Sequence, residues 1–425
     1  MLLKNCRFVI TPKGVLENVN VIVENGKIAS VTDAIPKGSK KDKIIDCKDK
    51  IVSPSFANAH THLAMSLFRG YGEELELMQW LETKMWPIEN KMDEKDIYAG
   101  SLLSCIELIK SGVTAFNDMY FDMNGVARAA KETGLRASLS WAVVDEDKTS
   151  QKGSPLKNAE TFIKKWKKDK MILPSVGPHA IYTCNDELLK KSKQLANKHN
   201  TLLHMHVSET RKEVYGCWQK NKKRVIEYLD SLGILDSNTI AAHCGWLTKN
   251  EINVLSSKRV SIAHCPTSNM KLATGGEFPF SELFGKGANV AIGTDGSASN
   301  NNLNMFEEMK FASLLHKHSR WSATVATANQ VFEAATINGF KALRINSGTI
   351  EKGKNADLVL LDAKDISLQP LTKDRLINHL VYSNPITAVD TVICNGKILM
   401  ENKKITIVDE EKVLATFNNS VKSLF

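Results

Sequence analysis

The segment Ile51-Val52-Ser53-Pro54-Ser55-Phe56-Ala57-Asn58-Ala59-His60-Thr61-His62 is an apolar run that ends in two histidines one residue apart. Residues i and i+2 of a β-strand point to the same side, so His60 and His62 leave the strand in one direction. Reactive side chains at the carboxyl end of a buried strand are typical of a parallel barrel. The segment therefore predicts a barrel strand that carries two candidate metal ligands at its mouth.

The same arrangement recurs along the middle of the chain. Short apolar runs lie at residues 51–59, 113–118, 136–143, 172–178, 201–207, 239–243, 260–264 and 289–294. Most precede a stretch with helical character, for example residues 96–110, 125–132, 186–198 and 222–232. Glycines stand where such helices would end, at Gly112, Gly134 and Gly233. Eight alternations of strand and helix predict an α/β fold, the (β/α)8 TIM barrel. The long connection at residues 66–95 is expected to be functional.

Both ends of the chain have β character instead. Asn25-Gly26 separates strands expected at residues 15–23 and 27–31, and Asn395-Gly396 lies inside an expected hairpin at residues 389–400. Asn-Gly between apolar runs is a strong hairpin signal. We expect a small β-sandwich domain built from both termini, residues 1–55 plus 348–425, beside a barrel of residues 56–347. A length of 425 residues suits that combination.

Composition excludes several classes of protein. The net charge of +9 comes from lysine runs without any nucleic-acid-binding motif, which indicates solvated helix faces and no nucleic-acid partner. Eight scattered cysteines form no Cys-x-x-Cys pair, so neither a disulfide framework nor a thiolate zinc site is expected. No apolar run approaches the roughly 18 residues that span a bilayer, and the first residues do not form a signal peptide. We expect a cytoplasmic protein with no membrane partner.

Histidines gather at the expected strand ends. Six of the 11 lie there: His60, His62, His179, His206, His243 and His264. Asp295 holds the same position after the last strand. Three imidazoles, those of His60, His62 and His206, with the Asp295 carboxylate form a ligand set that leaves a coordination position for water. Residues 172–184 contain no lysine that could bridge a second ion, so one divalent metal is predicted.

Four further residues lie near this set. Glu209 follows His206 by three residues, where a carboxyl group can be tuned to act as an acid. His243 is placed to orient or polarise a metal-bound water. His204 would lie one layer below His206 and is more often a hydrogen-bonded core histidine than a ligand. His264 is as consistent with a structural role as with a functional one.

With these histidines and Asp295 at the strand ends, the sequence resembles the amidohydrolase superfamily. More narrowly, it is similar to the 5-methylthioadenosine/S-adenosylhomocysteine deaminase family, including its 5′-deoxyadenosine deaminase-like members. The matching segments are residues 58–62, 86–89, 206–209, 241–244, 265–269, 293–296 and 356–359.

The resemblance implies a hydrolytic deamination of a 5′-substituted adenosine, such as 5′-methylthioadenosine or 5′-deoxyadenosine, with S-adenosylhomocysteine and adenosine as alternatives. The metal, zinc or alternatively ferrous iron, would lie on His60, His62, His206 and Asp295. Asp295 would accept a proton from the metal-bound water as hydroxide attacks C6 of adenine, and Glu209 would protonate the ring.

Substrate contacts are implied as well. Glu89 would bind the ribose hydroxyls, and His179 would contact the nucleoside. Relatives that accept S-adenosylhomocysteine carry arginines after the third strand, whereas this chain has Trp141 there and no Arg from Glu146 to Leu156. A bidentate carboxylate contact needs a guanidinium group. We therefore expect Trp141 to contact an uncharged 5′ group, as in 5′-methylthioadenosine or 5′-deoxyadenosine.

Other functions remain open at this stage. A deaminase or chlorohydrolase acting on guanine or a triazine ring would use the same metal set. A non-catalytic relative is disfavoured because such a protein would be expected to lose ligands or the acid, and this chain keeps both. The expected partner is a small purine nucleoside, and we expect an oligomer of identical chains.

Overall fold

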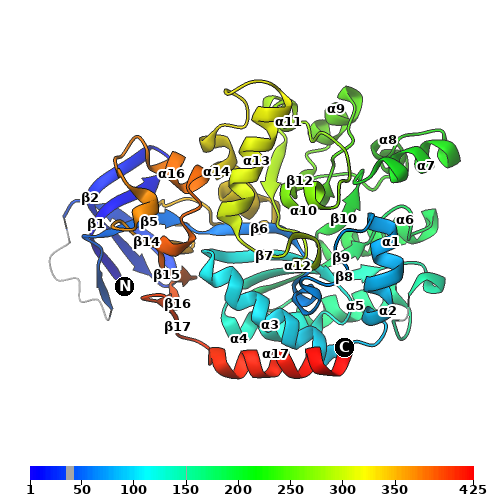
Figure 1. The fold of residues 1–425 in the computed structure, drawn as a ribbon, viewed down its shortest axis with the longest axis horizontal. Coiled ribbons are helices and arrows are strands. Elements are labelled where there is room, and N and C mark those ends of the chain that lie inside the picture. Colours follow the sequence, from blue (N-terminus) through cyan, green and yellow to red (C-terminus); the bar gives the residue numbers. More distant parts are fainter. Residues whose placement is uncertain (35–42, 150) are drawn as a thin grey trace.

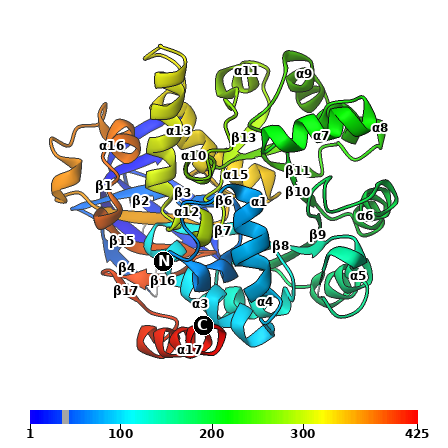
Figure 2. The ribbon, with the colours of Figure 1, turned by 45° about the vertical axis from the view of Figure 1, so that its right-hand side comes forward.

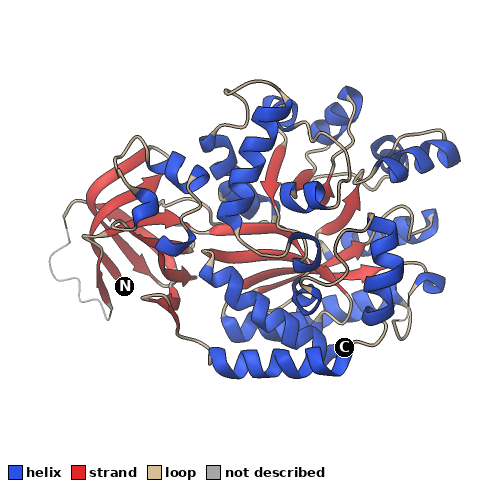
Figure 3. Ribbon diagram, in the orientation of Figure 1, coloured by secondary structure: helices blue, strands red, loops and turns tan. Residues whose placement is uncertain are grey.

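The computed structural model describes residues 1–34, 43–149 and 151–425. Its centre is an eight-stranded parallel sheet whose strands follow one another in chain order (Figure 1, Figure 3). The strands are β6 (Phe56–Thr61), β7 (Val113–Tyr120), β8 (Arg136–Val143), β9 (Ile172–Pro178), β10 (Leu203–Val207), β11 (Thr239–His243), β12 (Ser261–His264) and β13 (Asn289–Ile292). The predicted TIM barrel is confirmed.

The two ends of this sheet meet and close the barrel. The backbone N–H of Asp295, just after β13, donates to the carbonyl of His60 on β6 at 3.0 Å. Gly293 permits that approach, because an added Cβ there would lie 2.7 Å from the backbone nitrogen of His60. Closure thus places the ends of the first and last strands side by side.

Helices surround the barrel (Figure 2). They are α3 (Glu94–Lys110), α4 (Asn124–Thr133), α5 (Pro155–Trp166), α6 (Asp186–His199), α7 (Arg211–Asn221), α8 (Val225–Ser231), α9 (Lys249–Ser257), α10 (Pro266–Lys271), α11 (Phe280–Gly285), α12 (Ser297–Asn300), α13 (Met305–Ser319), α14 (Ala328–Ala335) and α15 (Ile337–Ala342). The expected C-cap glycines Gly112, Gly134 and Gly233 all have positive φ, at 84°, 71° and 74°.

Two element boundaries differ from expectation. The run predicted as one strand at residues 51–59 is divided into β5 (Lys50–Pro54), which belongs to the second sheet, and β6. The chain changes sheets at Ser55, whose N–H donates to Asp357 at 3.1 Å. The helix predicted at 222–232 is α8 alone, and a separate helix, α7, precedes it because Thr210 caps a new N-terminus.

The second sheet is mixed and joins both termini of the chain (Figure 1). Its strands are β1 (Leu2–Thr11), β2 (Gly14–Glu24), β3 (Lys27–Thr32), β4 (Ile44–Asp46), β5, β14 (Leu358–Asp362), β15 (Val389–Cys394), β16 (Lys397–Glu401) and β17 (Lys404–Ile405). Both Asn-Gly pairs have positive φ at both residues, as the predicted hairpins require. The predicted composite β domain is confirmed, while its boundaries stay a prediction, and residues 35–42 of it lie outside the described part.

Two additions to the barrel were not expected from the sequence. Residues 77–89 form a continuous short helical segment over the barrel mouth: α1 (Leu77–Trp80), a π-helical turn (Leu81–Met85) and α2 (Trp86–Glu89). We name residues 77–89 the mouth segment.

The second addition is the last helix, α17 (Glu410–Leu424), which lies along α3, where Glu410 pairs with Lys110 (Figure 1). A further short helix, α16 (Leu376–Tyr382), belongs to the terminal region. Within the described residues, no helix has the length and apolarity that a bilayer crossing requires.

Candidate metal centre and active site

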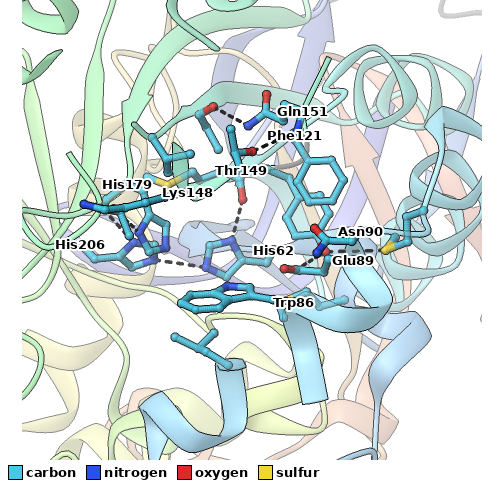
Figure 4. Close-up of a pocket in the computed structure, with 18 of the residues that line it drawn as sticks. His62, Trp86, Glu89, Asn90, Phe121, Lys148, Thr149, Gln151, His179 and His206 are labelled. Atoms are coloured by element: carbon cyan, nitrogen blue, oxygen red, sulfur yellow. Dashed lines mark hydrogen bonds between the residues drawn. The ribbon is translucent and has the colours of Figure 1, made fainter. Parts of the chain in front are cut away.

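Four predicted ligands converge at the barrel mouth. His60 and His62 come from β6, His206 from β10 and Asp295 from the turn after β13. The Nε2 atoms of His62 and His206 lie 3.3 Å apart (Figure 4). Asp295 Oδ1 lies 3.3 Å from Nε2 of both His60 and His62. The fold thus brings together all four residues that the sequence proposed as ligands.

The outward nitrogen of each imidazole is held by a neighbour. His62 Nδ1 lies 2.6 Å from the carbonyl oxygen of Met119. His206 Nδ1 lies 3.0 Å from the carbonyl oxygen of His179. A carbonyl can only accept, so both Nδ1 atoms carry the hydrogen and both Nε2 atoms offer a lone pair to the centre.

This cluster is suited to a metal ion. His60 Nε2 is buried and has no hydrogen-bond partner within the described residues. An unpartnered buried nitrogen is costly, and a cation on its lone pair would remove that cost. Ligand atoms of His60, His62 and His206 all lie within 4.8 Å of one another, as do those of His60, His243 and Asp295. Histidine nitrogens with one carboxylate form a donor set that zinc accepts.

The Asp295 carboxylate is fixed on both of its oxygens. Oδ2 accepts from the hydroxyls of Ser268 at 2.5 Å and Ser299 at 2.9 Å. Oδ1 accepts from the N–H of Gly296 at 2.8 Å and faces the two histidines. Ser268 lies in one of the segments that resemble the family, but nothing in the sequence predicts this role for it.

Glu209 lies beside the cluster and is buried. Burial, reinforced by the charge of Asp295, raises the pKa of Glu209 to about 8, against the opposing effect of His62. Its backbone N–H donates to Glu213 Oε2 at 2.8 Å, and the N–H of Ser208 donates to Glu213 Oε1 at 3.2 Å. Glu213, which sequence analysis missed, therefore holds the turn that presents Glu209.

His243 has a defined orientation. The side-chain amide N–H of Asn269 donates to its Nδ1 at 3.1 Å, so the hydrogen of a neutral ring lies on Nε2. His243 Nε2 lies 3.9 Å from Glu209 Oε2. His243 is thus arranged to donate a hydrogen bond into the site.

A cavity of about 670 Å³ opens above the cluster. The mouth segment forms part of its wall, with Trp86 and Glu89 turned toward His62 (Figure 4). The hydroxyl of Tyr120, which lies at the end of β7, donates to Glu89 Oε1 at 2.5 Å. His179 also lines the cavity, with its Nδ1 2.9 Å from Thr183 Oγ1. Glu89 and His179, two of the predicted substrate contacts, therefore face the same space as the metal cluster, and the prediction of a functional 66–95 loop gains support.

Trp141 is not among the residues that line this cavity. Its indole packs against Phe162 on α5, at 5.8 Å between ring centroids, and its N–H donates to Gln151 Oε1 at 2.8 Å. Strand alternation explains the difference: Ser140 points into the barrel, so Trp141 points outward. In place of the indole contact that we expected, Gln151 itself lines the cavity (Figure 4).

Two lysines, and no arginine, are found among the described residues that line the cavity. Lys148 lies 3.2 Å from Asp145 Oδ2 and donates to the Tyr182 carbonyl at 3.2 Å. Lys152 also lines the cavity, and its charge acts on Asp122.

His264 lies outside this cavity. Its Nε2 is 3.1 Å from His316 Nε2, and its ring stacks on Phe278 at 4.0 Å between centroids. These contacts support the structural role that the sequence left open for His264.

The fold and the His/Asp cluster define a metal-dependent hydrolase type of TIM barrel. The model of the amidohydrolase family matches residues 51–399, and this chain belongs to that family. A 5′-deoxyadenosine deaminase of Methanosarcina acetivorans is 42% identical over 97% of this chain and 94% of its own length. A 5-methylthioadenosine/S-adenosylhomocysteine deaminase of Archaeoglobus fulgidus is 42% identical over 100% and 99%.

Solved structures agree with the fold. An adenosine deaminase from Xanthomonas campestris with bound zinc superposes with a TM-score of 0.94 at 32% identity, covering 100% of this chain and 98% of that one. An atrazine chlorohydrolase from Arthrobacter aurescens, complexed with zinc, superposes at 0.90 over 99% of each chain, but at 20% identity this likeness concerns the fold alone.

Proposed function

We propose that this protein is a hydrolytic deaminase of 5′-substituted adenosines that releases ammonia and the inosine analogue. The observation that carries the proposal is one cavity that unites the His/Asp cluster, Glu209 and Glu89. The near-full-length similarity to 5′-deoxyadenosine deaminases and to 5-methylthioadenosine/S-adenosylhomocysteine deaminases supports the same reaction.

We propose that His60, His62, His206 and Asp295 hold one divalent ion, with zinc as the first candidate. Such an ion, when bound, acts as a Lewis acid and lowers the pKa of water. The known zinc-bound structural relative supports this choice of metal.

The remaining groups would handle the proton transfers and orientation. Glu209, buried and close to the cluster, would donate a proton to the purine ring nitrogen. Asp295 would accept a proton from the attacking water, while His243 would orient that water through its Nε2–H. Asn269 supports that role, because its amide leaves His243 only the Nε2 hydrogen to offer.

At the other end of the substrate, Glu89 would accept hydrogen bonds from the ribose hydroxyls. Tyr120 already occupies Oε1 of Glu89, which leaves Oε2 as the principal acceptor. His179, which also lines the cavity, would contact the nucleoside.

We propose a preference for an uncharged 5′ substituent. No guanidinium is present among the described residues of the cavity wall, and Lys148 is engaged by Asp145 and a carbonyl. Without a bidentate partner, a buried amino-acid carboxylate would be poorly compensated. Gln151, instead of Trp141, is the residue that we assign to this part of the wall.

A substrate screen tests the proposal. Zinc-loaded protein is incubated with 5′-deoxyadenosine, 5′-methylthioadenosine, S-adenosylhomocysteine, adenosine, guanine and atrazine, and released ammonia or chloride is measured. Deamination of the 5′-substituted adenosines is expected. Release of chloride from atrazine or of ammonia from guanine alone would refute the assignment.

Three expectations stay predictions. These are the domain division at residues 55/56 and 347/348, the homo-oligomeric state and the cytoplasmic location. Light scattering of the purified protein would decide the second.

A further inference from the structure

One histidine beside the metal cluster has no role in the proposed chemistry. His204 lies on β10, two residues before His206, and is fully buried. Its Nε2 is 2.8 Å from Nδ1 of His60. Its Nδ1 is 3.3 Å from the hydroxyl oxygen of Ser140 on β8, and that oxygen is 2.7 Å from the hydroxyl of Ser175 on β9. We call His204, Ser140 and Ser175 the His204 chain.

The geometry gives this chain a direction. Nε2 of His60 faces the carboxylate of Asp295 at 3.3 Å and must be free of hydrogen to act as a ligand. The hydrogen of His60 then lies on Nδ1 and is donated to His204 Nε2. His204 must in turn carry its own hydrogen on Nδ1, where the Ser140 hydroxyl can accept it. A hydrogen on both facing nitrogens of the pair would abolish the 2.8 Å contact.

His60 differs from the other two imidazoles in this respect. His62 and His206 donate to main-chain carbonyls, which no substitution at the accepting residue removes. The hydrogen bond of the outward nitrogen of His60, Nδ1, depends instead on one side chain, that of His204. His204 is therefore the place where a substitution can alter the orientation and tautomer of a ligand without touching any ligand.

We propose that His204 is a positioning residue that holds His60 in the metal-binding tautomer and thereby sets the affinity of the site for its ion. The inference rests on the proposed metal site, but not on the identity of the substrate. Removal of such a partner typically weakens metal binding about 10–100-fold.

The test compares two substitutions of His204. Leu has a similar size but cannot accept a hydrogen bond, whereas Gln offers a carbonyl oxygen. The zinc dissociation constant of each full-length variant is measured by chelator competition, and the Co²⁺-loaded proteins are compared by absorption spectroscopy. We expect His204→Leu to weaken zinc binding about 10–100-fold and to alter the Co²⁺ spectrum, and His204→Gln to recover most of both.

A pair of serines on β8 provides a matched control that keeps the imidazole. Ser140→Ala breaks the next contact of the chain, whereas Ser138→Ala removes a buried hydroxyl that has no hydrogen-bond partner among the described residues. We expect a several-fold weaker zinc affinity for the first and a change below about twofold for the second. If His204→Leu fails to fold, this pair and His204→Gln decide the question.

The outcomes separate this inference from the proposed metal site. Wild-type protein that binds no zinc would refute the metal site itself. Tight zinc binding by wild type together with unchanged affinity in His204→Leu, or equal effects of Ser140→Ala and Ser138→Ala, would overturn the role of His204. A purely structural histidine would lower the melting temperature of apo and loaded protein alike and leave the dissociation constant unchanged.

Discussion

Glu213 offers a sharp test of how the proposed acid is positioned. Glu213 and Glu251 occupy the third position of α7 and α9, three residues after the capping threonines Thr210 and Thr248. Glu251 returns to its own N-cap, accepting from the N–H of Thr248 at 2.8 Å. Glu213 instead accepts from the N–H groups of Ser208 and Glu209. The same pattern, a capping threonine followed three residues later by a glutamate, thus caps helix α9 in one place and orients the turn that carries Glu209 in the other.

Glu213→Gln should lower kcat strongly and the free energy of unfolding only moderately. Glutamine keeps one accepting oxygen, so one of the two buried N–H groups loses its partner at a cost of about 1–3 kcal/mol. A displacement of Glu209 by about 1 Å would lower kcat by about 100-fold. Deamination is followed at saturating 5′-deoxyadenosine and pH 8, because burial raises the pKa of Glu213 to about 7 and the carboxylate form is wanted. Urea unfolding gives the stability of the same samples.

Glu251→Gln is the matched control. Glu251 is more deeply buried than Glu213 and also accepts from Arg224 Nε at 2.8 Å, so its loss should destabilise the fold at least as much. Because Glu251 does not line the cavity, kcat should stay within about twofold of wild type. Near-normal kcat in Glu213→Gln at the expected loss of stability would refute the positioning of Glu209 by Glu213.

Four further predictions follow from the site and its surroundings. His206→Ala should lose the metal, and elemental analysis of fully loaded wild type should find one ion per chain; two ions would contradict the single site. Glu209→Gln should keep the ion and lose about 10²–10⁴ in kcat, since it removes an acid and no ligand. The kcat/KM for 5′-deoxyadenosine or 5′-methylthioadenosine should exceed the kcat/KM for S-adenosylhomocysteine at least about tenfold, which corresponds to about 1.4 kcal/mol. Gln151→Arg should reduce this ratio, and equal kcat/KM values for all three substrates in wild type would exclude the preference for an uncharged 5′ group. Burial raises the pKa of Glu308 to about 8, so the native state binds this proton more tightly than the unfolded state and stability falls as pH rises from about 4.5 to about 8. Glu308→Gln should therefore gain at least about 1.4 kcal/mol relative to wild type between pH 5 and pH 8 in urea unfolding, and parallel pH profiles would contradict this.

The sequence predicted the parts of the fold that depend on local periodicity. Eight apolar runs and the histidines after them located the barrel strands, and two Asn-Gly pairs located the hairpins. It failed where tertiary contacts decide. Residues 51–59 are continuously apolar, and only the pairing of β5 with β1 and β14 divides them between two sheets. The mouth segment is too short and irregular to show helical periodicity, and its conformation depends on the barrel beneath it.

The candidate site was predictable as a cluster of histidines and one aspartate, and only partly as a set of contacts. Histidines and Asp295 are rare enough at strand ends to be noticed without a structure. Ser268 and Asn269 carry ordinary polar side chains, and nothing in their spacing connects them to Asp295 or His243. Glu213 lies close to Glu209 in the chain, but its spacing from Thr210 is that of an ordinary helix cap. The contacts of Ser268 and Asn269 arise because loops from different strands meet at the barrel mouth, which a linear sequence does not record.

Strand alternation also predicts which residues lie beneath the His/Asp cluster. On β8 and β10, residues two positions apart share the barrel interior, so a residue that lies two before a ligand is placed directly beneath it. His204 stands in that relation to His206, yet its contact is with His60, because the opposite strand β6 lies across the narrow interior. The same alternation turns Ser140 inward toward His204 and Trp141 outward toward Phe162. Strand parity therefore separates the layer beneath the His/Asp cluster from the residues that only pack against helices.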